Sequence, residues 1–316
     1  MRKTVGVSLL LIVLSLVLVK YFTFSSDTEE DNDNYQRYFN KSYKVFAIEL
    51  PDSISFCDEV VPTDMVDIEE RLDREMLVNS YWQSQTLLFF KRANKYFPVI
   101  EPILKEKGVP DDFKYIALIE SGLTNIVSPA GASGYWHFLK KTAQQYNLEV
   151  NDAVDERYNL EKSTIAFCDY ILEANSKFNN WTLAAASYNM GMTGIQKQIN
   201  RQKVNNYYDL LLNDETGRYV FRILAVKEIL SNPQKYGFHF RPKDLYQPYD
   251  YSIVEVDYPI ESLVNFSQEN GINYKILKEL NPWLRRSNLP NTKGNSYEVK
   301  IATKGLYSIT QPSDSI

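Results

Sequence analysis

Cysteine and histidine are scarce in this chain of 316 residues, which has two of each. The two cysteines, Cys57 and Cys168, are too few for a disulfide framework and too far apart for a metal motif. Two histidines also argue against a multi-histidine zinc site. Cys168 lies in an apolar run, which predicts a buried thiol, while a bridge to Cys57 is allowed in an oxidising compartment.

A surplus of basic residues is also missing, because 35 Lys and Arg face 40 Asp and Glu and the net charge is −5. Too few cations remain to neutralise a phosphate backbone, which argues against nucleic acid as a main partner. Aromatic residues are plentiful, with 23 Tyr and 16 Phe. Aromatic rings build cores, and their flat faces also suit the C–H groups of sugar rings.

Only the N-terminus carries a long apolar run. Arg2 and Lys3 precede the apolar stretch 5–19, which is the pattern of an export signal. Residues 1–24 are therefore predicted to be a signal peptide or a signal anchor, and both place the rest of the chain outside the cytoplasm. An acidic run follows without a basic residue, so residues 25–54 are expected to form a solvated tether.

Helical periodicity begins near residue 65 and continues to 97, with Pro98 and Pro102 expected to punctuate it. A second helix is predicted over 111–121, where Glu120 shares a face with apolar side chains and Gly122 ends the helix. A carboxylate in such a place is costly to ionise, which suits a proton donor; a structural glutamate paired with arginine is the alternative. Further helices are predicted over the ranges 160–178, 181–190 and 216–230.

Between these helices, residues 128–134 form a turn-rich loop that leads to the aromatic cluster 135–139. Asn189 stands at the end of an alanine-rich helix, where a buried amide needs hydrogen-bond partners. The C-terminal part changes character. It alternates as strands near 252–256 and 297–301, with helices predicted over 260–270 and 274–280 between them.

Four of these segments occur in an order that resembles the lytic transglycosylase domain, most closely the membrane-bound lytic murein transglycosylase D type. They read Glu-Ser-Gly at 120–122, Ser-Pro-Ala-Gly-Ala-Ser-Gly-Tyr-Trp at 128–136, Ser-Tyr-Asn-Met-Gly at 187–191 and Glu-Thr-Gly-Arg-Tyr-Val at 215–220. The likeness covers about residues 55–240. It implies a mainly α protein with a lysozyme-like helical catalytic domain.

The resemblance also implies the site residues. Glu120 matches the single catalytic glutamate, and the expected substrate-binding residues are Ser121, Trp136, His137, Tyr188, Asn189 and Tyr219. The family's segment Gly-Leu-Trp-Gln has histidine here in place of glutamine. That change puts one amide contact to an N-acetyl group in doubt, although His137 can also donate one hydrogen bond.

The chemistry implied by the family needs one carboxylic acid and no cofactor or metal. Glu120 donates a proton to the oxygen between N-acetylmuramic acid and N-acetylglucosamine and then accepts the C6 hydroxyl proton, which leaves a 1,6-anhydro end. Two alternatives stay open. A lysozyme-type hydrolase on the same fold requires a second carboxylate, such as Asp155 or Glu156. A non-catalytic peptidoglycan-binding protein is the other.

Residues 249–303 resemble a LysM domain, a small binder of N-acetylglucosamine oligomers with βααβ order, and here a structural cap is the alternative. Residues 304–316 are a tail. Together these features predict a monomeric cell-envelope enzyme, exported by its N-terminal segment and acting on peptidoglycan glycan strands, with membrane contact through that segment.

Overall fold

The computed structural model describes residues 45–303 together with residues 34, 37 and 41. The predictions for the export signal at 1–24, most of the acidic tether and the tail at 304–316 lie outside these residues. The chain forms two compact units, residues 1–47 and residues 48–316, and every helix and strand named below belongs to the second. No helix in the described part of the chain is long and apolar enough to cross a bilayer.

The second unit opens with a short antiparallel hairpin of β1 (Ser55–Phe56) and β2 (Glu59–Val60). Phe56 is fully buried and packs edge-on against Phe113, with 5.1 Å between ring centroids. Both oxygens of the Glu59 carboxylate accept hydrogen bonds from the first amides of a later helix, at 2.6 and 2.8 Å. The hairpin is therefore part of the helical domain.

Two helices follow, α2 (Val66–Tyr81) and α3 (Gln83–Lys107), where the sequence predicted one helix ending before Pro98. The chain breaks at Trp82, and α3 continues through both Pro98 and Pro102. Both prolines are exposed and four residues apart on one face, so water can satisfy the carbonyls that lose their intrahelical donors. Gly108, with a φ of 72°, ends the helix at the predicted break.

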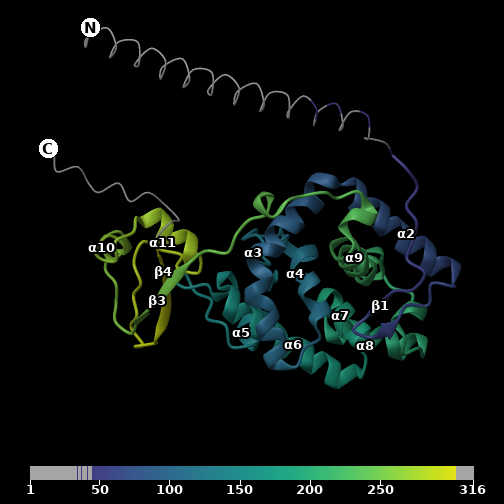
Figure 1. Ribbon diagram of the computed structural model, residues 1–316. Coiled ribbons are helices and arrows are strands. Elements are labelled where there is room, and N and C mark those ends of the chain that lie inside the picture. Colours follow the sequence, from purple (N-terminus) through teal and green to yellow (C-terminus); the bar gives the residue numbers. More distant parts are fainter. Residues whose placement is uncertain (1–33, 35–36, 38–40, 42–44, 304–316) are drawn as a thin grey trace, which may run out of the picture. The chain divides into compact units, whose positions relative to one another are not determined.

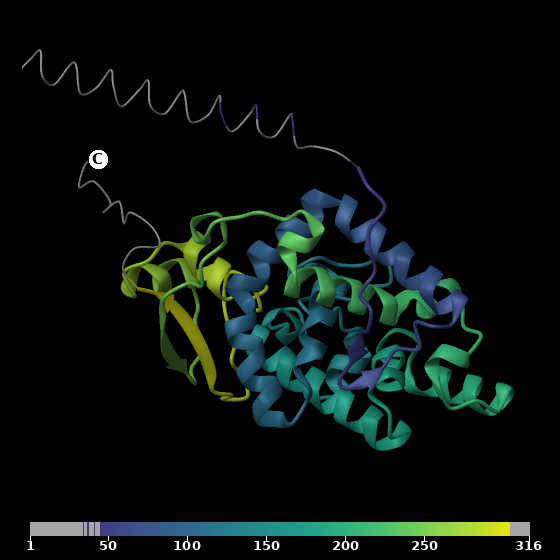
Figure 2. The same cartoon turned by 45° about the vertical axis from the view of Figure 1, so that its right-hand side comes forward.

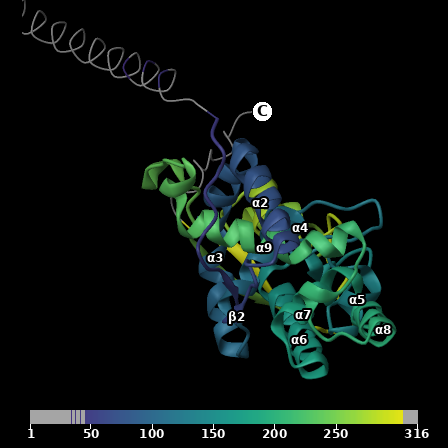
Figure 3. The same ribbon diagram turned by 90° about the vertical axis from the view of Figure 1, so that its right-hand side faces the viewer.

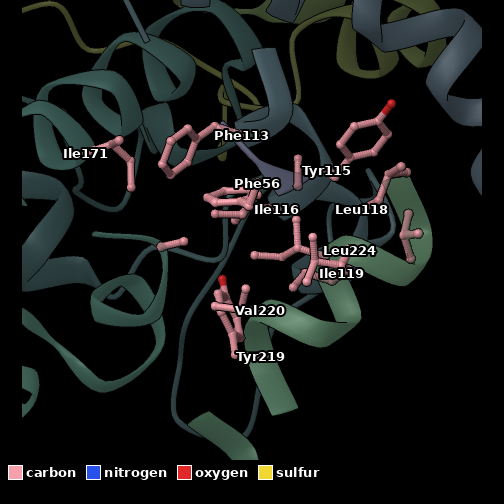
Figure 4. Close-up of a cluster of buried hydrophobic side chains, with 14 of the residues drawn as sticks. Phe56, Phe113, Tyr115, Ile116, Leu118, Ile119, Ile171, Tyr219, Val220 and Leu224 are labelled. Atoms are coloured by element: carbon pink, nitrogen blue, oxygen red, sulfur yellow. The ribbon is translucent and has the colours of Figure 1, made fainter. Parts of the chain in front are cut away.

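The glutamate helix α4 (Lys114–Ser121) follows a 3-10 turn, η1 (Asp111–Phe113), and ends at Gly122, whose φ is 61°. Every residue of α4 except Glu120 is buried. The helix packs against the long helix α9 (Asp214–Ser231), which also packs against α2 (Figure 3). Figure 4 shows the core that forms around this contact, including Ile116, Ile119 and Tyr219.

The remaining helices of this domain lie below α4 and α9 in the view of Figure 1. Two of these helices have the bounds that the sequence predicted, 160–178 and 181–190, whereas the helix over 192–202 was not predicted. They are α5 (Lys140–Gln145), α6 (Leu160–Phe178), α7 (Trp181–Met190) and α8 (Met192–Gln202), with short 3-10 turns η2 (Glu156–Tyr158), η3 (Tyr207–Asp209), η4 (Pro233–Tyr236) and η5 (Pro242–Asp244).

The C-terminal domain confirms the predicted βααβ order. Its elements are β3 (Tyr251–Val256), α10 (Leu263–Glu269), α11 (Tyr274–Leu280) and β4 (Tyr297–Ala302). The two strands pair antiparallel, with Tyr251 opposite Ala302 and Val256 opposite Tyr297 (Figure 2). The mainly α fold class with a small α+β domain is therefore confirmed.

A second hydrophobic cluster joins this small domain to the helical one. It contains Val154 and Tyr158 from the helical domain together with Leu284 and Trp283 from the C-terminal domain. The backbones also pair here, since Asp155 N donates to Trp283 O at 2.9 Å and Arg285 N donates to Ala153 O at 2.8 Å. The C-terminal domain is consequently held by main-chain hydrogen bonds as well as by apolar packing.

Candidate active site

Glu120 stands at the last turn of α4 with 18% of its side chain exposed. Its Oε1 accepts a hydrogen bond of 2.6 Å from the hydroxyl of Tyr219, and its Oε2 lies 3.6 Å from Nδ1 of His137. One carboxylate oxygen is therefore fixed by a phenol, while the other faces an imidazole. The remaining exposure leaves the group accessible to a ligand.

Tyr219 comes from α9, and its side chain is 1% exposed. Burial raises the pKa of Tyr219 well above its usual value, and the nearby negative charge of Glu120 raises this pKa further. The phenol consequently keeps its proton throughout the neutral range and serves as a permanent donor to Glu120. Because α9 packs against both α2 and α4, this donor is positioned by rigid elements.

Two arginines bind the carbonyls on either side of Glu120. Arg222 donates to Ile119 O at 2.8 Å, and Arg92 donates to Gly122 O at 3.0 Å. Cations at a helix C-terminus satisfy its free carbonyls and oppose its negative dipole. Sequence reasoning missed both residues. The spacing of Tyr219 and Arg222, which places them on one face of a helix, was the available signal.

The loop 131–138, here called the His137 loop, brings His137 to the side of Glu120 opposite Tyr219. Ser133 N donates to Phe138 O at 3.0 Å, which closes the loop, and His137 adopts a left-handed backbone with a φ of 54°. Gly134 also has a positive φ, 79°, and a Cβ there would stand 1.9 Å from Arg157 O. Only glycine fits at that point. Nε2 of His137 is buried without a hydrogen-bond partner among the described residues.

Ser121 and Tyr188 hold the His137 loop through its backbone. The hydroxyl of Ser121 donates to Tyr135 O at 2.6 Å, and that of Tyr188 donates to Trp136 O at 2.7 Å. Burial, followed by the charge of Glu120, raises the pKa of Tyr188 well above its usual value. Both side chains, expected from the sequence to meet the substrate, thus have their hydroxyl protons engaged by the loop.

Trp136 lies on the core side of the loop, where its side chain is fully buried. Its ring stacks on Phe167 with 3.7 Å between centroids, and Nε1 donates to the hydroxyl of Thr164 at 3.0 Å. The sequence predicted a substrate contact for this residue. The structure differs, because an indole with its N–H satisfied and its face stacked is placed in the core and behind the loop.

Asn189 connects the ends of two helices near the site. It accepts a hydrogen bond of 2.7 Å from the hydroxyl of Thr216 and donates to Glu215 at 3.1 Å. The side chain is partly exposed at the end of α7. The amide therefore has the partners that its burial requires and still reaches the surface, beside the start of the helix that carries Tyr219.

The two acids considered for activating water are committed to other partners. Both oxygens of Asp155 accept from the guanidinium of Arg157, at 2.9 and 2.7 Å. Glu156 accepts from Glu149 N at 2.8 Å and from the ammonium of Lys162. Each residue is at most 7% exposed. Buried and paired in this way, neither has an oxygen available to polarise a water molecule.

Both cysteines are free thiols in the structure. Cys168 is buried as predicted, and burial raises the pKa of its thiol to about 12. Burial and the charge of Asp112 raise the pKa of Cys57 as well. Both groups therefore stay protonated and unreactive near neutral pH. No cluster of potential metal ligands occurs among the described residues.

Two protein families match this chain. Residues 97–211 match the Transglycosylase SLT domain, and residues 252–305 match the Soluble lytic transglycosylase C-terminal LysM-like domain. The first match contains the Glu120 helix, the His137 loop and Asn189. The chain therefore carries an SLT transglycosylase domain followed by a LysM-like domain, in agreement with the resemblance read from the sequence.

Among curated proteins, the membrane-bound lytic murein transglycosylase D of Escherichia coli K12 is 28% identical over 228 residues. That alignment covers 70% of this chain and 49% of the relative, and the same protein of Escherichia coli O6:H1 gives the same values. The chain thus spans about half the length of the curated relatives it matches.

Two solved structures share part of the chain's arrangement. An inactive mutant of the lytic transglycosylase Slt from Pseudomonas aeruginosa has 17% identity and a TM-score of 0.35 over 48% of this chain and 26% of its own. The 70 kDa soluble lytic transglycosylase of Escherichia coli has 18% identity and a TM-score of 0.38, over 49% of this chain and 27% of its own.

Proposed function

We propose that this chain is a peptidoglycan lytic transglycosylase that cleaves the β-1,4 bond between N-acetylmuramic acid and N-acetylglucosamine. The observation that carries the proposal is the pairing of a single, partly exposed carboxyl group, Glu120, with a buried tyrosine that donates 2.6 Å to one of its oxygens. The SLT domain match spans the glutamate but ends before Tyr219. The phenol contact therefore adds to that match.

In the first step Glu120 is the acid. Its proton passes to the glycosidic oxygen, the bond from that oxygen to C1 of the muramoyl ring breaks, and the N-acetylglucosamine leaves with a free hydroxyl. The carbonyl oxygen of the substrate's own 2-acetamido group stabilises the positive charge left at C1. Tyr219 holds Oε1, so Oε2 is the oxygen left to face the glycosidic bond.

In the second step Glu120 is the base. As a carboxylate it accepts the proton of the C6 hydroxyl, and the C6 oxygen bonds to C1 in place of the stabilising contact from the acetamido oxygen. The product is a 1,6-anhydro end, Glu120 is again protonated, and no water is consumed. The permanent hydrogen bond from Tyr219 stabilises the carboxylate form that exists between the two steps. No metal or organic cofactor takes part.

Several substrate contacts belong to the proposal. The Nε2 of His137 is buried without a partner in the described structure, and a turn of the imidazole would present it to an N-acetyl substituent beside Glu120. The partly exposed Asn189 can turn its amide to a sugar hydroxyl at the cost of its bond to Glu215. Ser121, Tyr188 and Trp136 are proposed to act through the His137 loop.

We place this activity in the cell envelope, where the glycan strands of peptidoglycan lie, with the N-terminal segment as the export signal and as the point of membrane contact. The Escherichia coli relatives are named membrane-bound and murein-acting, which supports this location. Wall binding by the C-terminal domain is a further part of the proposal, supported by its match to a LysM-like family.

Mass spectrometry of purified glycan strands digested by the wild type and by Glu120→Gln tests the proposal. Anhydromuramoyl ends from the wild type and none from the variant are the expected result. Reducing muramoyl ends would instead identify a lysozyme-type hydrolase, for which Asp155 and Glu156 are poor candidates as the base because both are engaged by other partners. Binding without any cleavage would identify a non-catalytic protein.

A further inference from the structure

Arg157 joins the two ends of the His137 loop by hydrogen bonds. Its Nη1 donates to Gly131 O and to Phe138 O, at 3.0 Å each. These two carbonyls stand at the two ends of the loop, so one nitrogen ties both ends together. The side chain of Arg157 is 9% exposed, which makes it a buried cation.

Asp155 holds this guanidinium in place. The two side chains form a two-bond fork, with 2.9 Å from Nε and 2.7 Å from Nη2, and the side-chain atoms of Asp155 taken alone are also only 9% exposed. A planar fork fixes the direction of the third nitrogen, Nη1, more tightly than a single contact can. The direction of Nη1 toward the loop is thus set by the position of Asp155.

The C-terminal domain in turn holds the backbone of Asp155. Asp155 N donates to Trp283 O at 2.9 Å, and the neighbouring Val154 pairs with Leu284 across the domain boundary. Val154 is 2% exposed and Leu284 is fully buried. The guanidinium of Arg285 also lies 4.1 Å from the centroid of the Tyr158 ring, next to Arg157. A continuous series of contacts therefore runs from the C-terminal domain to the His137 loop.

We propose that Arg157 is a positioning residue for the active site and that the C-terminal domain anchors it through Asp155. In this arrangement the small domain fixes the loop that places Nδ1 of His137 3.6 Å from Glu120. It is thus a built-in part of the catalytic unit, in addition to any wall binding. The effect on the reaction rests on the proposed function, whereas the effect on the loop does not.

Histidine NMR tests the structural half directly, because the chain has only two histidines, His137 and His239. In the full-length protein labelled with 15N-histidine, Arg157→Lys is expected to shift the imidazole signals of His137 and to leave those of His239 in place. Lysine keeps the charge but loses the fork, so it cannot hold both Asp155 and the two carbonyls. Leu284→Ala, at the domain boundary, is expected to shift the same signals by a smaller amount.

A matched control is Lys227→Met. Lys227 also donates both to a half-buried carboxylate, Asp112 at 2.6 Å, and to a backbone carbonyl, Ser55 O at 2.9 Å. Unlike Arg157, it holds the N-terminal hairpin against α9 and makes no hydrogen bond to the His137 loop. It should lower the melting temperature without moving the His137 signals. Unmoved signals in Arg157→Lys would overturn the role of Arg157. Unmoved signals in Leu284→Ala alone would overturn the role of the C-terminal domain.

Kinetics separate positioning from stability. With glycan strands as substrate, Arg157→Lys is expected to lower kcat by about tenfold or more, because the loop holds His137 beside Glu120. KM is expected to rise as well, because His137 is the proposed contact to the N-acetyl group. Lys227→Met should leave both constants unchanged well below its melting temperature. Equal kcat in the wild type and Arg157→Lys would refute the catalytic part. A wild type that makes no anhydro ends would refute the proposed function, while the NMR result would still stand.

Discussion

Replacing Tyr219 with phenylalanine removes one hydroxyl and leaves the buried ring in the core. The lost interaction is the 2.6 Å hydrogen bond to Glu120 Oε1. A hydrogen bond to a charged group contributes about 1.5–3 kcal/mol. If that energy is lost from the transition state, kcat should fall by about 10- to 150-fold, since about 1.4 kcal/mol corresponds to a factor of ten.

The assay is the steady-state release of anhydromuramoyl products, with kcat and KM determined separately. KM should change little, because the Tyr219 side chain is 1% exposed and faces Glu120 from the core. Tyr236→Phe is the matched control. It also removes a buried phenol that donates to a glutamate of α9, Glu228 at 2.8 Å, but at the far end of the helix. It should leave kcat unchanged.

A kcat for Tyr219→Phe within a factor of about two of the wild type would refute the assignment of Tyr219 as the group that fixes Glu120. An equal fall in kcat for Tyr236→Phe would show instead that α9 responds to any lost phenol. In that case the loss would report the stability of the helix and not the chemistry of the site.

Three other changes have expected outcomes. Gly134→Ala should lower the free energy of unfolding by about 1–3 kcal/mol or more in chemical denaturation, because a Cβ would meet Arg157 O at 1.9 Å on a backbone with positive φ; an unchanged midpoint would contradict the loop geometry. Glu59→Gln should lower the free energy of unfolding by about 1 kcal/mol, again measured by chemical denaturation, because it removes the negative charge at the N-terminus of α7. Cys168 should resist a thiol reagent at pH 8 until the protein unfolds, since burial raises its thiol pKa to about 12, and rapid labelling of the native protein would contradict this.

Much of the fold follows from local sequence. Apolar residues at helical spacing predicted the bounds of α6 and α7. The structure adds the reason for where these helices begin, since Asn159 and Asn180 are their N-caps. Glycine after Glu120 predicted the end of α4. In contrast, Pro98 and Pro102 were misread as breaks, because their effect depends on whether the freed carbonyls face water, and this is decided by packing.

The candidate site was predictable only in part. The motif order predicted Glu120 and Tyr219, which the structure brings within 2.6 Å of each other although 99 positions separate them. The role of Arg157 was not predictable, because its carbonyl partners lie 19 and 26 positions away and no local pattern marks such contacts. Trp136 was expected in the site. The loop turns its ring toward Phe167 instead, and this depends on the backbone angles of the loop.

The central claim is that the C6 hydroxyl of the substrate, and not water, closes onto C1. Digestion of glycan strands in water enriched in 18O, followed at once by mass spectrometry of the new muramoyl ends, tests this claim most directly. New ends that lack one water and carry no label are the expected result. New ends that contain the elements of water and carry 18O would contradict it and would make the enzyme a hydrolase.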